Sequence, residues 1–211
     1  MLVEMFFDTA CPWCRVGQRH LQLALAQWQA EPVSVRYRSY VQDPSIPPEG
    51  LDFRAYMLAK GQGKTPLGAF FDGPQRAGTA AGLAFRFWDI ERTPNTLLSH
   101  RLLALAPEQR TGDLLQAVFE AYFARAQDIG DLEVLVVLAA NLGLDAGSLR
   151  RQLQGEGGLP QVQADQQRAA TLGIRDVPFF LLAGRVAFGG AQTPEGILRG
   201  LRVAARPITD R

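Results

Sequence analysis

The chain has 211 residues, of which 47% are hydrophobic and 20% are charged. This is the balance of an ordinary globular protein, and it excludes a disordered chain. The length suits one domain, or one domain that carries a large insertion. The 22 basic and 21 acidic residues leave a net charge of +1. Bulk charge therefore attracts neither nucleic acid nor an acidic membrane.

The sequence shows neither a membrane span nor a secretory signal. No stretch approaches the roughly 20 apolar residues that a transmembrane helix needs. Residues 1–7 enter an apolar run at once, without the basic segment and small-residue cleavage site of a signal peptide. We therefore expect a cytoplasmic protein. Because the cytosol keeps thiols reduced, its two cysteines, Cys11 and Cys14, are not expected to form a passive structural clip.

The N-terminal part predicts a strand, a helix and a second strand. Residues 2–7 form an almost unbroken apolar run, which is typical of a buried strand. Residues 16–28 carry apolar side chains at near-helical spacing, and Pro32 closes this helix. Residues 33–38 alternate between apolar and polar, as strands do. If the two strands are parallel neighbours, they form a βαβ unit with a right-handed crossover.

The middle of the chain predicts a block of helices. Residues 42–50 carry three prolines, which exclude regular structure. From residue 51 to about 153 the pattern is helical throughout, and no strand of comparable strength is found. Residues 154–160 form a second loose segment. After it, residues 162–172 predict a helix that ends at Gly173 as its C-cap.

The C-terminal part predicts a hairpin and a last helix. Apolar strands at residues 179–182 and 186–188 flank a tight turn at Gly184-Arg185. Thr193 is a good N-cap, and Pro194 suits the first position of the final helix. The element order is therefore β-α-β, a helical block, and α-β-β-α.

The sequence Cys11-Pro12-Trp13-Cys14 stands directly after the first strand and opens the first helix. Unpaired N–H groups and the positive end of the helix dipole favour a thiolate at Cys11, so we expect a pKa below about 8.5. Cys14 lies one turn further on, within reach of a disulfide. An exposed thiolate can attack a substrate disulfide, and a second thiol then expels the product. We assign Cys11 as the nucleophile and Cys14 as the resolving thiol. Pro12 is tolerated in the first turn, and Trp13 tunes access.

Two other interpretations of the cysteine pair remain open. Half a zinc site would need further ligands, but no other cysteine exists and the only histidines, His20 and His100, are not paired in sequence. Two buried thiols could also meet without any chemistry. A C-x-x-C after a strand within a βαβ pattern is, however, a redox signature. His100 lies in an apolar helix and is expected to be a packed or surface residue rather than a catalytic base.

Several segments in this order resemble the thioredoxin superfamily, specifically its DsbA-like branch and the cytoplasmic FrnE-type members of that branch. Residues 11–14 match the active-site motif, residues 173–180 resemble the loop and strand around a cis-proline, and residues 189–193 resemble the segment before the last helix. Residues 94–96, 100–101 and 121–123 resemble segments that recur in the helical insertion of these proteins.

The resemblance covers essentially the whole chain and implies an α/β architecture. This is a thioredoxin-like fold with a large all-helical insertion between its βαβ and ββα halves. Residues 1–45 and 156–211 then form the thioredoxin-like domain, and residues 46–155 form the insertion.

The resemblance also implies roles for residues outside the cysteine motif. The Val177–Pro178 bond is expected to be cis, so that the Val177 backbone can pair with an extended substrate while Pro178 presents no N–H of its own. Many thioredoxin-like proteins bury a carboxylate beneath the cysteines as a proton relay. Asp8 resembles an aspartate common in FrnE-type sequences, and Glu4 is the other acid on the first strand. Asp8 is equally well read as a solvated residue at the strand end.

The function implied is that of a thiol–disulfide oxidoreductase that reduces, forms or isomerises disulfides in protein or small-molecule substrates. Such an enzyme needs no cofactor beyond its dithiol, and glutathione is a candidate co-substrate. The oligomeric state is left open, with a homodimer as one possibility. The kappa-class glutathione transferases and the 2-hydroxychromene-2-carboxylate isomerases are similar in architecture and give the alternative function. Since an isomerase needs no resolving thiol, the presence of both Cys11 and Cys14 favours redox chemistry. A thiol-dependent chaperone or binding module is the third interpretation.

Overall fold

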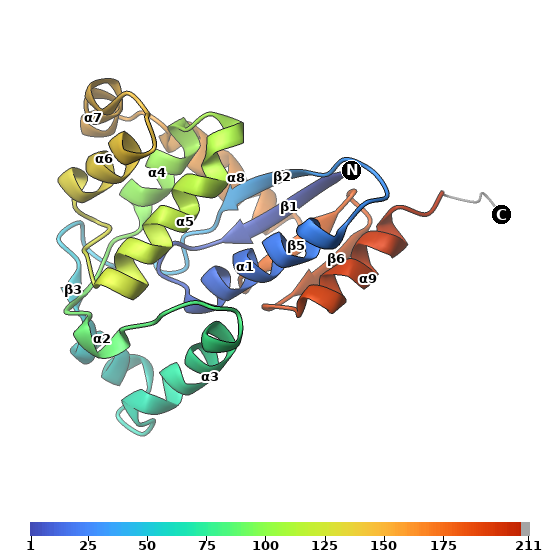
Figure 1. Ribbon diagram of the computed structural model, residues 1–211. Coiled ribbons are helices and arrows are strands. Elements are labelled where there is room, and N and C mark those ends of the chain that lie inside the picture. The colour runs from blue at the N-terminus through green and yellow to red at the C-terminus, as the bar shows by residue number, and fades with distance from the viewer. Residues whose placement is uncertain (208–211) are drawn as a thin grey trace.

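The computed structural model describes residues 1–207 and has a four-stranded sheet with helices on both faces (Figure 1). The strand order is β2-β1-β5-β6, with β1 at Leu2–Phe7, β2 at Ser34–Ser39, β5 at Phe179–Leu182 and β6 at Val186–Gly189. β1 and β2 are parallel, whereas β1–β5 and β5–β6 are antiparallel. The predicted βαβ unit and the predicted hairpin are both confirmed.

The sequence pattern of each strand matches its place in the sheet. β1 lies inside the sheet, where both faces are covered, and Val3, Met5, Phe6 and Phe7 are all essentially buried. β2 lies at an edge, and its alternation of exposed and half-buried residues reflects one solvated face. The apolar run of residues 2–7, interrupted only by Glu4, is therefore the signal of the central strand.

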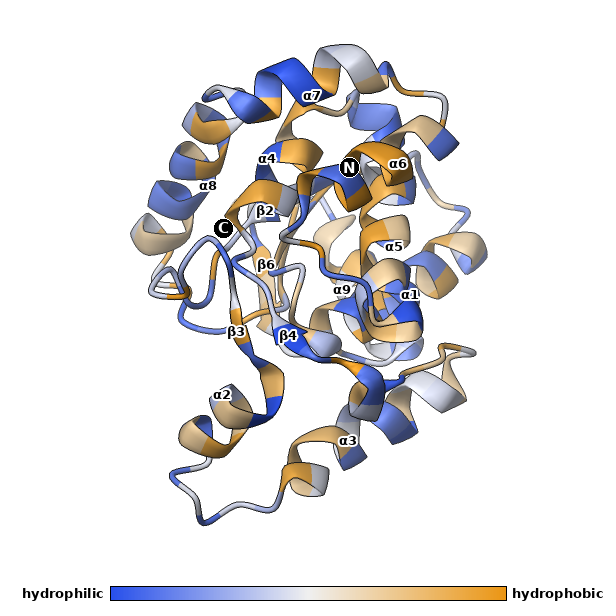
Figure 2. Ribbon diagram, turned by 90° about the vertical axis from the view of Figure 1, so that its left-hand side faces the viewer, coloured by the Kyte–Doolittle hydropathy of each residue, from blue (hydrophilic) through white to orange (hydrophobic). Residues whose placement is uncertain are grey.

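Helices cover the two faces of the sheet. α1 (Pro12–Gln27) and α9 (Pro194–Ala204) lie side by side on one face, and α8 (Leu159–Thr171) lies on the other (Figures 1 and 2). The predicted N-cap is confirmed, since the Thr193 side chain accepts a hydrogen bond from the N–H of Gly196.

Two boundaries in the C-terminal part differ from the prediction. α8 begins within the segment predicted to be loose, because Gly158 takes a left-handed conformation (φ +77°) before it and Pro160 suits a first turn. The hairpin turn begins one residue earlier than predicted, at Ala183, and both Ala183 and Gly184 have positive φ. The last four residues of the predicted thioredoxin-like domain, 208–211, lie outside the described residues.

Between β2 and α8 the chain forms a largely helical insertion. Its helices are α2 (Phe53–Lys60), α3 (Leu67–Ala80), α4 (Leu97–Leu105), α5 (Glu108–Arg125), α6 (Leu132–Asn141) and α7 (Ala146–Gln154). α4 to α7 pack together, whereas α2 and α3 extend from them as a hairpin (Figure 2). Within residues 1–207, no helix has both the length and the apolar character that crossing a membrane requires.

The prediction that this block is helical throughout is wrong in two places. β3 (Leu51–Asp52) pairs with β4 (Arg92–Thr93) in a small antiparallel sheet, and Phe87–Asp89 form a 3₁₀ turn. Strands of two residues are too short to produce an alternating pattern, so only the pairing of distant segments reveals them.

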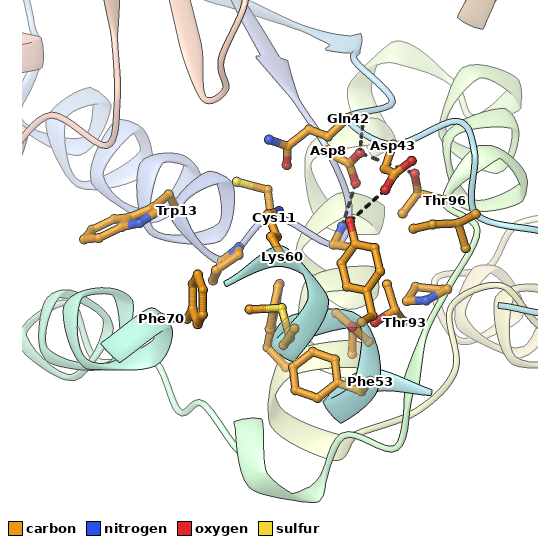
Figure 3. A pocket seen from close by; sticks show the side chains of 18 of the residues that line it. Asp8, Cys11, Trp13, Gln42, Asp43, Phe53, Lys60, Phe70, Thr93 and Thr96 are labelled. Atoms are coloured by element: carbon orange, nitrogen blue, oxygen red, sulfur yellow. Dashed lines mark hydrogen bonds between the residues drawn. The ribbon is translucent and has the colours of Figure 1, made fainter. Parts of the chain in front are cut away.

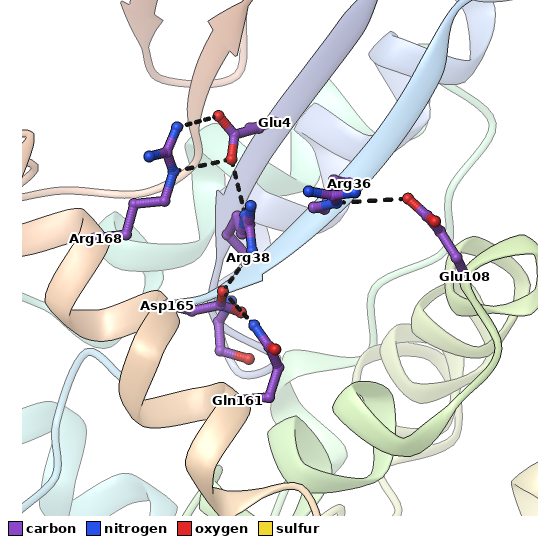
Figure 4. A network of polar contacts seen from close by, with 8 residues as sticks. Glu4, Arg36, Arg38, Glu108, Gln161, Asp165 and Arg168 are labelled. Carbon is purple, nitrogen blue, oxygen red and sulfur yellow. Dashed lines mark hydrogen bonds and ion pairs between the residues drawn. The ribbon is translucent and has the colours of Figure 1, made fainter. Parts of the chain in front are cut away.

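A network of charged side chains, in which the carboxylates are buried, joins the main sheet to α8 (Figure 4). Glu4 on β1 accepts hydrogen bonds from Arg38 at 2.9 Å and from Arg168 at 2.5 Å, and Arg38 also donates to Asp165 at 2.9 Å. Burial raises the pKa of Glu4, but the hydrogen bonds from Arg168 and Arg38 outweigh it and hold the pKa below its usual value. Glu4 is thus an ionised partner of two arginines.

Candidate active site

The two cysteines lie where β1 gives way to α1. Cys11 is the N-cap of α1, and its Sγ accepts a hydrogen bond from the N–H of Cys14 at 3.3 Å. Both are free thiols. Cys14 is fully buried and Cys11 is 5% exposed. Cys11, the predicted nucleophile, was expected to be exposed but presents only a small part of its surface to solvent.

The two thiols have different electrostatic surroundings. Burial raises the pKa of Cys14 well above its usual value, and the hydrogen bond and charge of Cys11, together with the charge of Asp8, raise it further. Cys14 is therefore protonated at neutral pH. Cys11 Sγ, in contrast, lies at the positive end of the α1 dipole beside a backbone N–H. A sulfur at a helix N-terminus is suited to attack first, whereas a buried, protonated thiol is suited to react in a later step.

The loop before β5 lies against Cys11. The Val177–Pro178 peptide bond is cis, and Cys11 Sγ is 3.6 Å from the carbonyl oxygen of Val177. Gly17 permits this approach, because a Cβ at that position would lie 3.0 Å from Cγ of Pro178. The pairing of β5 with β1 thus brings together residues that are 166 positions apart.

A cavity of about 340 Å³ opens beside Cys11, between the thiol and the α2–α3 hairpin (Figure 3). Trp13 and Phe70 lie on one side of it, and Asp8 and Asp43 lie on the other. The buried apolar walls include Ile46, Phe53, Phe71, Phe87 and Phe123. This volume falls in the range of small-molecule binding sites.

Asp8 is a buried residue of the cavity wall, so the alternative prediction of a solvated strand end is wrong. It is 3% exposed. Its carboxylate accepts hydrogen bonds from the N–H groups of Ala10 at 2.8 Å and Gln42 at 2.7 Å, and from Oγ1 of Thr96 at 3.4 Å. Burial raises the pKa of Asp8 to about 6, and these hydrogen bonds limit the rise. Glu4 does not line the cavity.

His100 lies next to Asp8. It was predicted to be a packed or a surface residue, and it is packed, since it is fully buried with its ring 5.1 Å from that of Phe7. Its Nε2 is 4.0 Å from Oδ1 of Asp8, and neither ring nitrogen has a hydrogen-bond partner within residues 1–207. Burial lowers the pKa of His100 to about 3, so the ring is neutral and the contact with Asp8 is not an ion pair. His20 lies elsewhere on α1, with Nδ1 2.8 Å from the carbonyl oxygen of Gln192.

Several residues of the cavity were not predicted from the sequence. Lys60 and Tyr56 come from α2, and Asp43 comes from the loop after β2. The Tyr56 hydroxyl donates to Oδ2 of Asp43 at 2.9 Å. No motif marks these positions, because they lie on two separate segments that only folding brings to the cysteines. Within the described chain, no three His, Cys, Asp or Glu side chains are grouped to hold a metal ion.

Two more distant solved structures share this fold. One is a 2-hydroxychromene-2-carboxylate isomerase, at 15% identity and a TM-score of 0.66, with 90% of this chain and 89% of that chain covered. The other is the cytosolic disulfide reductase DsbM from Pseudomonas aeruginosa with GSH, at 17% identity and a TM-score of 0.64, with coverage of 97% and 96%. At these identities the likeness shows the fold alone.

Nearer relatives identify the family. A probable DsbA oxidoreductase from Streptomyces coelicolor is 34% identical with a TM-score of 0.90, and the match covers 100% of this chain and 93% of that chain. The uncharacterised protein YwbO of Bacillus subtilis (strain 168) is 26% identical over 201 residues, which is 90% of each chain. Residues 2–201 match the family model of the DSBA-like thioredoxin domain. The chain therefore belongs to the DsbA-like thioredoxin domain family, which confirms the predicted thioredoxin-like fold and the resemblance to the DsbA-like branch.

Proposed function

We propose that this protein is a thiol–disulfide oxidoreductase with Cys11 as nucleophile and Cys14 as resolving thiol. The observation that carries the proposal is the asymmetry of the pair. Cys11 Sγ lies at the N-terminus of α1 and lines the cavity, whereas Cys14 is fully buried and protonated behind it. A transferase or isomerase has no use for the second thiol.

The reaction proceeds by two thiol–disulfide exchanges. The Cys11 thiolate attacks one sulfur of a substrate disulfide, which forms a mixed disulfide and releases the other half as a thiolate. Cys14 then loses its proton and attacks Sγ of Cys11, so that the internal disulfide forms and the second half leaves as a thiol. The substrate gains two electrons and the dithiol loses two. A low-molecular-weight thiol such as glutathione is the proposed reductant that returns them, and the reverse sequence forms a substrate disulfide.

Asp8 is the proposed acceptor of the Cys14 proton. Its carbonyl oxygen accepts a hydrogen bond from the N–H of Cys11 at 3.1 Å, and its charge acts on the pKa of Cys14. A carboxylate whose pKa is about 6 can take up and return a proton near neutral pH. Val177 is the proposed backbone partner of an extended substrate, because it lines the cavity beside Cys11.

The proposal is tested by equilibrating the protein in glutathione redox buffers. Thiol trapping and tryptophan fluorescence, to which Trp13 contributes, report the state of the cysteine pair. We expect a reversible Cys11–Cys14 disulfide with a potential between about −270 and −120 mV. A stable glutathione adduct on Cys11 without an internal disulfide would instead make the glutathione-linked transferase or isomerase the better function.

Cys14→Ser separates the two steps of the reaction. Without a resolving thiol, we expect turnover to stop and covalent substrate adducts to accumulate on Cys11, as seen by non-reducing electrophoresis and mass spectrometry. Cys11→Ser is the control, because it removes the nucleophile and should yield no adduct. Undiminished turnover by Cys14→Ser contradicts the assigned roles.

A further inference from the structure

The charged groups on the wall of the cavity beside Cys11 are mostly acidic. Asp8, Asp43 and Asp176 line it, and Lys60 is the one basic residue among the described residues of the wall. Arg175 lines a neighbouring hollow that shares Asp43, Lys60 and Asp176 with the cavity. Even with Arg175 included, acidic residues outnumber basic ones, so the charged side chains around the cavity carry a net negative charge.

Hydrogen bonds hold two of these carboxylates in place. The Asp8 carboxylate is buried and accepts backbone N–H groups. Asp43 accepts hydrogen bonds from Oγ of Ser45 at 2.5 Å and from the hydroxyl of Tyr56 at 2.9 Å. Lys60, in contrast, is an exposed residue at the end of α2, with Nζ 5.8 Å from the centre of the Tyr56 ring. The negative charge is thus built into the wall, and the positive charge is on a long exposed side chain.

We propose that, among small disulfide substrates, the cavity selects those that carry an amine over those that carry a carboxylate. With a substrate sulfur at Cys11, an ammonium group would be placed near Asp43 and Asp176. The aromatic walls add cation–π attraction. A carboxylate in the same position would meet like charges, which gives selectivity by repulsion. This inference rests on the proposed function and adds the substrate class.

The size of the cavity indicates a small molecule rather than a polypeptide chain. Its volume of about 340 Å³ lies in the range of small-ligand sites, and the α2–α3 hairpin bounds it opposite the thiol. Phe53, Phe71 and Phe87 would contact the carbon atoms of such a substrate.

The test uses three disulfides of similar length and different charge. Cystamine carries two ammonium groups, bis(2-hydroxyethyl) disulfide is neutral, and 3,3′-dithiodipropionate carries two carboxylates. The rate constant for oxidation of the reduced protein is measured with each by stopped-flow fluorescence at low salt. The same series with dithiothreitol corrects for the preference of any thiolate for cationic disulfides. For each dithiol, the rate constant with cystamine is divided by the rate constant with dithiodipropionate. We expect this rate ratio to be about tenfold larger for the protein than for dithiothreitol. This excess should shrink as salt is added.

Charge variants identify the residues responsible. Asp176→Asn is the first choice, because Asp176 is exposed and its substitution is not expected to disturb the fold. We expect Asp176→Asn and Asp43→Asn each to lower the rate ratio about threefold, and Lys60→Met to raise it. Asp113→Asn is the matched control, since Asp113 is an exposed residue of α5 that does not line the cavity. Thermal denaturation verifies that each variant is folded.

The outcomes distinguish this inference from the proposed function. A rate ratio equal to that of dithiothreitol and insensitive to Asp176→Asn overturns the inference, while formation of the Cys11–Cys14 disulfide leaves the proposed function standing. If none of the disulfides oxidises the pair, the proposed function fails instead. If lysine-flanked peptide disulfides show the charge selectivity and cystamine does not, the cavity serves polypeptides and the small-molecule class is wrong.

Discussion

At the scale of single residues, the site depends on groups that are buried away from water. Cys14 and Asp8 are both removed from solvent, and burial raises the pKa of each. The charge of Asp8 acts on the pKa of Cys14, and a carboxylate that titrates near neutral pH can accept a proton there. The neutral ring of His100, also buried, adds no charge to this pair.

Asp8→Asn tests the state of this carboxylate. The folded-state pKa of Asp8, about 6, lies above its ordinary value of 3.8, so folding favours the protonated form. The contribution of Asp8 to stability is therefore complete below pH 3.8 and is lost as the pH rises through about 6. Relative to Asp8→Asn, the free energy of unfolding of the natural protein should fall by about 2 kcal/mol between pH 4 and pH 7.

Urea denaturation across this pH range measures the difference. A kinetic readout goes with it, because loss of the proposed proton acceptor should slow the resolution of a mixed disulfide by about tenfold or more at pH 7. If the unfolding free energies of the two proteins change in parallel with pH, the raised pKa of Asp8 is wrong. An unchanged resolution rate would instead remove Asp8 from the proton transfer and leave it a structural residue.

At the scale of elements, charged side chains set how α8 sits on the sheet. Asp165 on α8 is 3% exposed and accepts hydrogen bonds from Arg38 of β2 and from the N–H of Ser39 at 3.0 Å. On the same strand, Arg36 pairs with Glu108 at 3.5 Å, but both side chains are about half exposed. The buried pair of Arg38 with Asp165 and the solvated pair of Arg36 with Glu108 therefore form a matched comparison on strand β2.

We expect Asp165→Asn to cost about 2 kcal/mol of unfolding free energy, because Arg38 loses a charged partner in a desolvated place. Glu108→Gln should cost less than about 1 kcal/mol, since water already screens that pair. Chemical denaturation of both variants measures the two values. If both variants lose the same unfolding free energy, burial does not make the ion pair at α8 contribute more to stability.

At the scale of the whole molecule, the α2–α3 hairpin meets the thioredoxin-like part at the active-site motif. A Cβ at Gly73 of α3 would lie 2.9 Å from Cζ2 of Trp13, so the missing side chain lets the indole pack against the hairpin. Trp13, which is predicted from the sequence to tune access, thus lies between Cys11 and the insertion. Nothing within 4 Å would meet a Cβ at Gly68, which belongs to the same helix.

Gly68→Ala should raise the free energy of unfolding by about 0.5 kcal/mol, because alanine favours helix over glycine. Gly73→Ala should lower it and displace Trp13, and Pro74 beside it adds to the cost. With Trp28 and Trp88 replaced by phenylalanine, acrylamide quenching of the remaining Trp13 reports the displacement. Unaltered quenching in Gly73→Ala means that Trp13 does not rest on the hairpin.

The sequence by itself determined the features that depend on neighbouring residues. The apolar run of residues 2–7, the spacing of the first helix, and the cap at Thr193 each identify their element, because strand burial, helix periodicity and capping are local effects. The position of Cys11 at a helix start follows from the same local order.

Only the tertiary structure decided what depends on contacts between distant segments. Asp8 looks the same in sequence whether it is solvated or buried, and the approach of Gln42 and Thr96 settles the matter. His100 reaches Asp8, and β3 reaches β4, across long stretches of chain, and such distant contacts leave no periodic signal in the sequence. The cavity and its acidic wall come from at least four separate segments. Burial and electrostatic potential are sums over such contacts, so they exist only once the chain has folded.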